Sequence, residues 1–151
     1  MSAGKNEKFF IEKFESAFGF GKLSGKQNFD NNQKGADKVS ISVDQSIKLE
    51  DGTTILIEID SANMAKLLVG QYVLLNGLVN PQKEQNIFLV VHYFKDYNPQ
   101  RTLKNLKEVR NLYPSSNWLK YCAIHVNELD EILSNCSTVE DFSAYIRSRI
   151  Y

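Results

Sequence analysis

Three acidic side chains are spaced so that they can act together. Glu58 and Asp60 lie two positions apart in the segment 53–60, and side chains two apart on a β-strand point to the same face. Asp44 lies fourteen positions before Glu58, and the segment 50–53 between them has the composition of a tight turn. A hairpin folded at this turn brings Asp44 beside the other two acids. Carboxylates that share one spot repel one another unless a cation lies among them.

Oxygen ligands of this kind favour Mg²⁺, with Mn²⁺ as a substitute. Asp44, Glu58 and the backbone carbonyl of Ile59 supply three oxygens, and Asp60 can add another carboxylate. A Mg²⁺ ion held by one or two carboxylates keeps several waters and binds substrate phosphate. It makes a bound water easier to deprotonate and stabilises charge on phosphorus-bound oxygens. The spacing therefore predicts a metal site suited to phosphate-ester hydrolysis.

Each of these acids also has a simpler interpretation. A slip of one residue in the hairpin would move Asp44 to the opposite face from Glu58. Asp60 can instead cap the helix that follows, and Asp37 competes with Asp44 because it precedes the same strand, although its hairpin position falls well past Asp60. An acid on a hairpin is commonly solvated, but Glu58 lies in an apolar strand with no local partner to offset its burial.

The hairpin and the helix after it are the elements that must position the acids. Segment 39–49 alternates apolar and polar residues, and Ile55, Ile57 and Ile59 form the apolar face of its partner strand. Cap-type residues at 61–63 precede a helix. We expect this helix to be buried, because apolar residues surround most of it: Met64, Leu67, Leu68, Tyr72, Leu74, Leu75 and Leu78.

The remaining chain alternates between strand and helix patterns. A phenylalanine-rich helix is predicted at 5–18, and the polar segment 21–35 that follows reads as a mobile loop. Strands are predicted at 86–94 and 120–126. Helices are predicted from Asn98-Pro99 to Tyr113, at 127–133 (a short helix or turn) and from Ser137, where Ser137 and Glu140 form a capping box. This order predicts an α/β fold whose mixed central sheet contains an early β-hairpin and has helices on both sides.

Basic residues occur in two places that could contact a phosphate backbone. Lys22, Lys26 and Lys34 lie in the polar segment, where they are either solvated or available to DNA. The helix that starts at Asn98-Pro99 carries a basic face, which is explained first by solvation and second by contact with a DNA backbone: Arg101, Lys104, Lys107 and Arg110. His92 ends an apolar strand, and we expect it to be structural.

The composition favours an ordinary globular protein. The 151 residues suit one domain, 1–151, and the formal net charge of zero removes a global electrostatic argument for nucleic-acid binding. Cys122 and Cys136 are predicted to be free thiols. The N-terminal stretch is charged throughout and unlike a signal peptide, and no apolar run suits a membrane span, so we expect a cytoplasmic protein.

The residues 37–78 resemble the core of the restriction-endonuclease-like superfamily, the PD-(D/E)xK nucleases. The family motif is an acid on one strand, an acid-x-lysine on its hairpin partner, and then a helix. Asp44 matches the first acid and Glu58 the second, whereas Asp60 stands in place of the lysine and Val43 in place of a frequent proline. The motif is short, so its specificity is low.

The resemblance implies roles for two residues of the helix. Lysines relocated to this helix occur in such families, so Lys66 is a candidate for the missing cation, which orients the attacking water and steadies phosphate charge. Gln71 is similar to the glutamine of RecB-type members. Asp60 would otherwise be a further metal ligand in an acid-x-acid arrangement.

Three functions follow from these expectations. The first is a Mg²⁺-dependent DNA endonuclease of restriction or repair type, acting on Asp44, Glu58 and Asp60 with Lys66 and Gln71, as a homodimer or as a subunit of a larger assembly. The second is a catalytically inactive nuclease-fold protein that binds DNA or assembles with a partner. The third is an interaction domain in which the acids are incidental.

Overall fold

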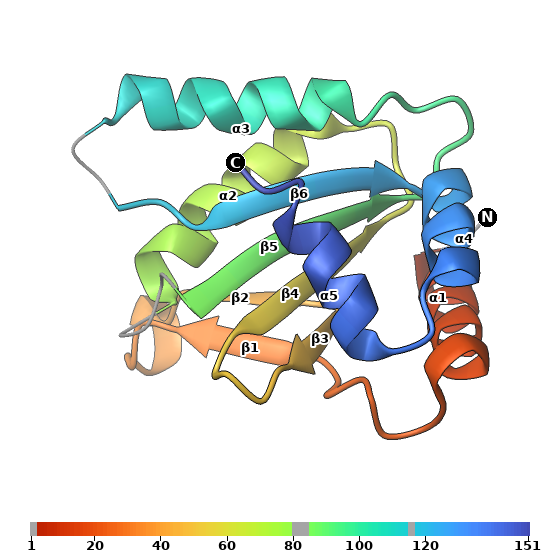
Figure 1. Cartoon of the computed structure of the whole chain (residues 1–151). Coiled ribbons are helices and arrows are strands. Elements are labelled where there is room, and N and C mark those ends of the chain that lie inside the picture. The colour runs from red at the N-terminus through yellow and green to blue at the C-terminus, as the bar shows by residue number, and fades with distance from the viewer. Residues whose placement is uncertain (1–2, 80–84, 115–116) are drawn as a thin grey trace.

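The computed structural model describes residues 3–79, 85–114 and 117–151 (Figure 1). Five α-helices, six strands and one 3₁₀ helix lie in these parts of the chain. In chain order they are α1 (Ala3–Phe18), β1 (Gln27–Asp30), η1 (Gly35–Asp37), β2 (Ser40–Val43), β3 (Gln45–Lys48), β4 (Thr54–Asp60), α2 (Ala65–Leu78), β5 (Asn86–His92), α3 (Gln100–Leu112), β6 (Lys120–His125), α4 (Val126–Asn135) and α5 (Val139–Arg147).

The central sheet is mixed, as predicted. Its strand order is β3-β4-β5-β6, with β3 antiparallel to β4 and the other neighbours parallel. The parallel pairs require crossover connections, which α2 and α3 provide. Strand β4, which carries Glu58, is therefore hydrogen-bonded on both sides.

Helices cover both faces of the sheet. Ile55, Ile57 and Ile59 point to the face covered by α1, α4 and α5, whereas Leu56 points to the face covered by α2 and α3. Figure 1 shows α5 in front of the sheet and α2 behind it. The period of two in segment 53–60 thus divides its side chains as predicted, and the general α/β class is confirmed. Glu58, in phase with Leu56, belongs to the α2 side.

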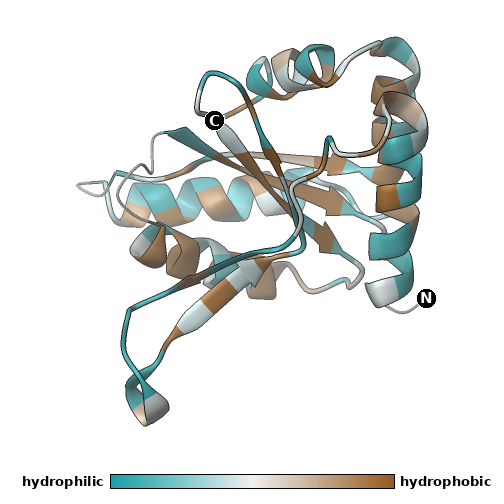
Figure 2. Ribbon diagram, turned by 90° about the horizontal axis from the view of Figure 1, so that it is seen from below, coloured by the Kyte–Doolittle hydropathy of each residue, from teal (hydrophilic) through white to brown (hydrophobic). Residues whose placement is uncertain are grey.

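The prediction of a loop at 21–35 was wrong in part. Strand β1 pairs with β2 in a separate antiparallel ribbon, in which Gln27 lies opposite Val43. Figure 2 shows this ribbon extending away from the helices. Phe29 is the single apolar residue of β1, and it packs with Ile41 against the α2 side of the core. One apolar residue in four gives no alternation, so backbone pairing rather than side-chain pattern defines this strand.

Helix α2 is buried on one face only. Leu68, Tyr72 and Leu75 pack against the sheet. The expectation of general burial was wrong for the other face, because four apolar side chains are 39–61% exposed: Met64, Leu67, Val73 and Leu74. None of the helices in the described ranges is long and apolar enough to cross a membrane.

The capping box of α5 lies one residue later than predicted. Thr138 accepts a hydrogen bond from the Asp141 backbone N–H (3.1 Å), and the Asp141 carboxylate accepts one from the Thr138 N–H (3.2 Å). Asp141 fulfils the role expected of Glu140, because a shorter acid at the third helical position also reaches the cap. Cys122 and Cys136 are free thiols, as predicted.

Candidate active site

The β3–β4 hairpin has the register predicted from the sequence. Gln45 lies opposite Ile57 and Ile47 opposite Ile55, and Asp44 and Glu58 are the next residues beyond the last pair of this ladder. The turn is closed by a hydrogen bond from the Leu49 N–H to the Thr53 carbonyl (2.8 Å), and Gly52 has a φ of +90°. A left-handed conformation suits glycine, which explains how segment 50–53 sets the register.

Asp44 lies at a bend that divides the predicted strand 39–49 into β2 and β3. Its Oδ2 accepts a hydrogen bond from the Ile59 backbone N–H (2.9 Å), which fixes the carboxylate against β4. Burial raises the pKa of Asp44, whereas the Ile59 N–H and the positive charge of Lys26 act in the opposite direction. The bend allows one chain segment to pair with β1 before Asp44 and with β4 after it.

Glu58 has the most strongly perturbed carboxyl group of the site. Burial, followed by the negative charge of Asp44, raises its pKa to about 8, and Asp60 adds a smaller effect in the same direction. Hydrogen bonds from the Gln71 side chain and the Asp44 backbone favour the ionised form. Glu58 therefore holds a proton at neutral pH, and a cation bound here would displace that proton.

Asp60 is held by a buried chain of hydrogen bonds. Its Oδ2 lies 2.9 Å from Nδ1 of His92, whose side chain is fully buried. The other ring nitrogen of His92 lies 2.9 Å from Thr102 Oγ1, which is 2.9 Å from the hydroxyl of Tyr97. The chain is satisfied when Tyr97 donates to Thr102, Thr102 to Nε2, and Nδ1–H to Asp60. His92 is structural, as predicted, and it orients Asp60.

The alternative roles of Asp60 and Asp37 are not observed. Helix α2 begins after Met64 without a side-chain cap, and Asp60 Oδ1 accepts only a 3.4 Å hydrogen bond from the Ala62 N–H. Asp37 is exposed in η1, at the outer end of the β1–β2 ribbon, whereas Asp44 faces Glu58. Of these two acids, Asp44 rather than Asp37 acts on Glu58.

The two predicted residues of α2 differ in their relation to the acids. Gln71 is half-buried, hydrogen-bonds to Glu58 and donates to the Ser42 carbonyl (3.1 Å), so it joins the site to β2. Lys66 is exposed and forms no ion pair within the part of the chain that the structure describes. The catalytic role predicted for Lys66 stays a prediction.

The basic face of α3 is partly engaged. Arg101 donates to Asn63 Oδ1 (2.6 Å), so Asn63 contacts α3 instead of capping α2 as predicted. The guanidinium of Arg110 lies over an aromatic ring of β6, 5.6 Å from its centre, whereas Lys104 and Lys107 are exposed. DNA contact by this face stays a prediction.

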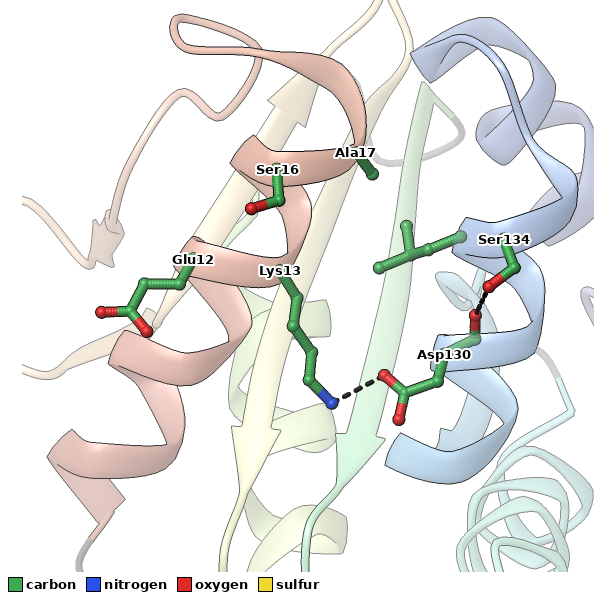
Figure 3. A pocket seen from close by; sticks show the side chains of 7 residues that line it. Glu12, Lys13, Ser16, Ala17, Asp130 and Ser134 are labelled. Atoms are coloured by element: carbon green, nitrogen blue, oxygen red, sulfur yellow. Dashed lines mark hydrogen bonds and ion pairs between the residues drawn. The ribbon is translucent and has the colours of Figure 1, made fainter.

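A separate hollow lies on the other side of the sheet from Glu58. It has a volume of about 440 Å³ and lies between α1 and α4 (Figure 3). Lys13 of α1 reaches across it to Asp130 of α4, with 2.6 Å between Nζ and Oδ1. Opposite charges already neutralise one another there, and the hollow has no connection to the acid pair.

Two carboxylates of the site suit a magnesium ion. Asp44 and Glu58 lie side by side, and burial together with the charge of Asp44 keeps Glu58 protonated at neutral pH. A bound cation would favour the ionised form of Glu58 and so offset the cost of burying its charge. Over the described residues, no group of three or more acidic, histidine or cysteine side chains is arranged as a metal site. Asp60 is hydrogen-bonded to His92, and the role of Asp60 as a third metal ligand stays a prediction.

We compared the chain with known protein families, with curated proteins and with solved structures, and none of them matched. A functional interpretation therefore depends on the chemistry of the site itself.

Proposed function

We propose that the protein is a Mg²⁺-dependent endonuclease that hydrolyses phosphodiester bonds of DNA. The observation that carries this proposal is the pair Asp44 and Glu58 at the end of the β3–β4 ladder, where burial and then the charge of Asp44 raise the pKa of Glu58 to about 8. Two carboxyl groups that are buried next to each other are unfavourable, and strongly perturbed carboxyl groups concentrate at functional sites.

The order of the elements supports the same proposal. Asp44 before β3, the hairpin to Glu58-Ile59-Asp60 and then helix α2 follow one another in the order of the PD-(D/E)xK motif, with Asp60 in place of the lysine. Gln71, which is similar to the glutamine of RecB-type members, hydrogen-bonds to Glu58 and so supports the proposal. The nuclease-like core and the DNA substrate belong to this proposal.

The residues present define the parts of the mechanism. Asp44 and Glu58 would hold Mg²⁺, which when bound supplies a Lewis acid and a readily deprotonated water. Gln71 orients the Glu58 carboxylate through its hydrogen bond, and the Ile59 N–H does the same for Asp44. His92 fixes Asp60, which can hold a water at the edge of the site. Metal binding requires ionised Glu58, so one proton leaves as the ion enters.

Cleavage of plasmid and of short duplexes tests this function. We expect cutting with Mg²⁺ or Mn²⁺, and a loss of at least about 10²-fold in Asp44→Asn and Glu58→Gln, since each removes a charge from the ion's ligands. Glu50→Gln, which changes an exposed acid of the same hairpin, is the matched control. Equal cutting by wild type and Glu58→Gln would reject this site.

An inactive nuclease-fold subunit is the second candidate. Asp60 at the lysine position of the motif favours it, and so does the exposed apolar face of α2, which offers Met64 and Leu67 to a partner. This alternative predicts binding of Mn²⁺ in calorimetry without cleavage of any DNA. Loss of Mn²⁺ binding in Asp44→Asn would then show that the acid pair binds metal without cutting.

A further inference from the structure

Lys26 and Asp44 are the next residues beyond the end of the β1–β2 ladder. The last pairs of that ladder are Phe29 with Ile41 and Gln27 with Val43, and neither Lys26 nor Asp44 belongs to a strand. The same register continues past these two residues, because the Ser24 N–H donates to the Ser46 carbonyl (2.8 Å).

Two buried side chains fix the segment that carries Lys26. The Gln45 Oε1 accepts a hydrogen bond from the Gly25 N–H (3.1 Å), and the Ser46 hydroxyl donates to the Gly25 carbonyl (2.8 Å). Gln45 is 8% exposed and Ser46 is fully buried. Gly25 itself has a φ of +85°, a conformation that suits glycine. The backbone next to Lys26 is therefore anchored on β3 directly beside Asp44.

The consequence is a group of three charged residues on three adjacent chain segments. Lys26 lies between Gly25, which is anchored on β3, and Gln27, which pairs with Val43, so its backbone passes beside Asp44. Asp44 contacts β4 through the Ile59 N–H, and its charge acts on Glu58. The positive charge of Lys26 opposes the rise in the pKa of Asp44 that burial causes, which agrees with this placement.

The ammonium group of Lys26 remains available. Lys26 is exposed, and it forms no ion pair with any residue that the structure describes. Lys26, unlike Lys66, is among the charges that act most strongly on Asp44, and neither lysine is among those that act most strongly on Glu58. A lysine that lies close to Asp44 and forms no ion pair with it can bind an external anion. A phosphate is such an anion, and the three N–H groups of an ammonium can bind it as a point charge.

We propose that Lys26 is the catalytic cation of this site and binds a non-bridging oxygen of the scissile phosphate. This inference rests on the proposed nuclease function, and it assigns to the β1 segment the role that the resemblance gives to a lysine at position 60. In the reaction, a water oxygen forms a new bond to phosphorus while the bond to the leaving deoxyribose oxygen breaks. The two water protons end on the leaving oxygen and on the product phosphate or solvent. Lys26 exchanges no proton and stabilises the negative charge that builds on phosphate oxygens.

Single-turnover cleavage of a DNA duplex at saturating Mg²⁺ tests this role. We expect Lys26→Met to lower the rate by about 10²- to 10³-fold and Lys26→Arg to retain part of it, since arginine keeps the charge. Lys48→Met is the matched control, because Lys48 is an exposed lysine on β3 at the far end from Asp44. Thermal unfolding checks that each variant is folded. Calorimetry with Mn²⁺ gives a second measurement: removing a positive charge beside Asp44 should tighten metal binding several-fold.

The outcomes separate this inference from the proposed function. If wild type cuts and folded Lys26→Met cuts equally well, Lys26 is excluded and the nuclease function stands. If Lys66→Met loses activity and Lys26→Met does not, the cation comes from α2 and the inference is overturned. If wild type cuts no DNA with any metal, both proposals fail together. Loss in Lys26→Met, partial recovery in Lys26→Arg and tighter Mn²⁺ binding support the inference.

Discussion

Replacing Glu58 by glutamine should stabilise the metal-free protein at high pH. The carboxyl group of Glu58 has a pKa of about 8 in the folded protein and an ordinary value of 4.5. The folded state therefore holds the proton more tightly than the unfolded chain does. The stability that Glu58 contributes is complete below pH 4.5 and is lost as the pH rises toward 8, beyond which it changes no further. Glutamine has the same shape and does not ionise, so it avoids this loss.

The size of the effect follows from the pKa difference. One pKa unit corresponds to about 1.4 kcal/mol. Relative to its value at low pH, the free energy of unfolding of wild type therefore falls by about 1 kcal/mol at pH 5, about 3 kcal/mol at pH 7 and about 5 kcal/mol at pH 9 through Glu58. Between pH 5 and pH 9 the free energy of unfolding of Glu58→Gln should rise relative to wild type by about 4 kcal/mol. For a chain of this length this corresponds to about 10 °C in Tm.

Urea unfolding at pH 5, 7 and 9 in the presence of a chelator measures this difference. The chelator is needed because a metal that binds only the folded state would stabilise wild type selectively. Glu50→Gln, an exposed position in the turn of the same hairpin, should show no such pH dependence. If Glu58→Gln gains no stability over wild type between pH 5 and pH 9, Glu58 does not carry a buried, destabilised charge, and the physical basis of the site is refuted.

Three further predictions concern the network, the metal and the surface. Thr102→Val should lower the free energy of unfolding by about 1–3 kcal/mol in urea titrations, because it leaves buried His92 Nε2 without its partner. Mn²⁺ affinity measured by calorimetry should rise up to about tenfold per pH unit between pH 6 and pH 8, because one proton leaves Glu58 on binding, and then level off. Lys13→Ala should change the free energy of unfolding by less than about 1 kcal/mol, because its ion pair with Asp130 is exposed.

The sequence was sufficient for the hairpin because its signals are local. Alternation of side chains fixes which face Ile57 and Glu58 occupy, and Gly52 fixes where the chain turns. Together these two features place Asp44 and Glu58 next to each other, and in the structure they are the residues beyond the last pair of the ladder, Gln45 and Ile57. The burial of Glu58 was also predicted from the sequence, because Glu58 lies within an apolar strand.

The parts that sequence reasoning missed depend on pairing between distant segments. Strand β1 has one apolar residue, so nothing in its composition indicated that it would pair with β2 and bring Lys26 close to Asp44. The partners of His92 could not be predicted either, because Thr102 approaches it only after β5 and α3 pack together. The exposed face of α2 was predicted to be buried because composition alone does not indicate how much of a helix the sheet can cover.

The hydrogen bond of His92 requires an acid at position 60, and the cation that we propose for the site therefore comes from Lys26. His92 is fully buried, and its Nδ1 lies 2.9 Å from Asp60, so an acceptor is required at position 60. A lysine there would place an ammonium against a ring N–H and leave that buried donor unsatisfied. We therefore expect Asp60→Lys, made to restore the family motif, to lower Tm and to leave the Lys26→Met defect in cleavage uncorrected. If Asp60→Lys in the Lys26→Met protein instead recovers cleavage without loss of Tm, the cation need not come from β1, and the coupling between His92 and the site is incorrect.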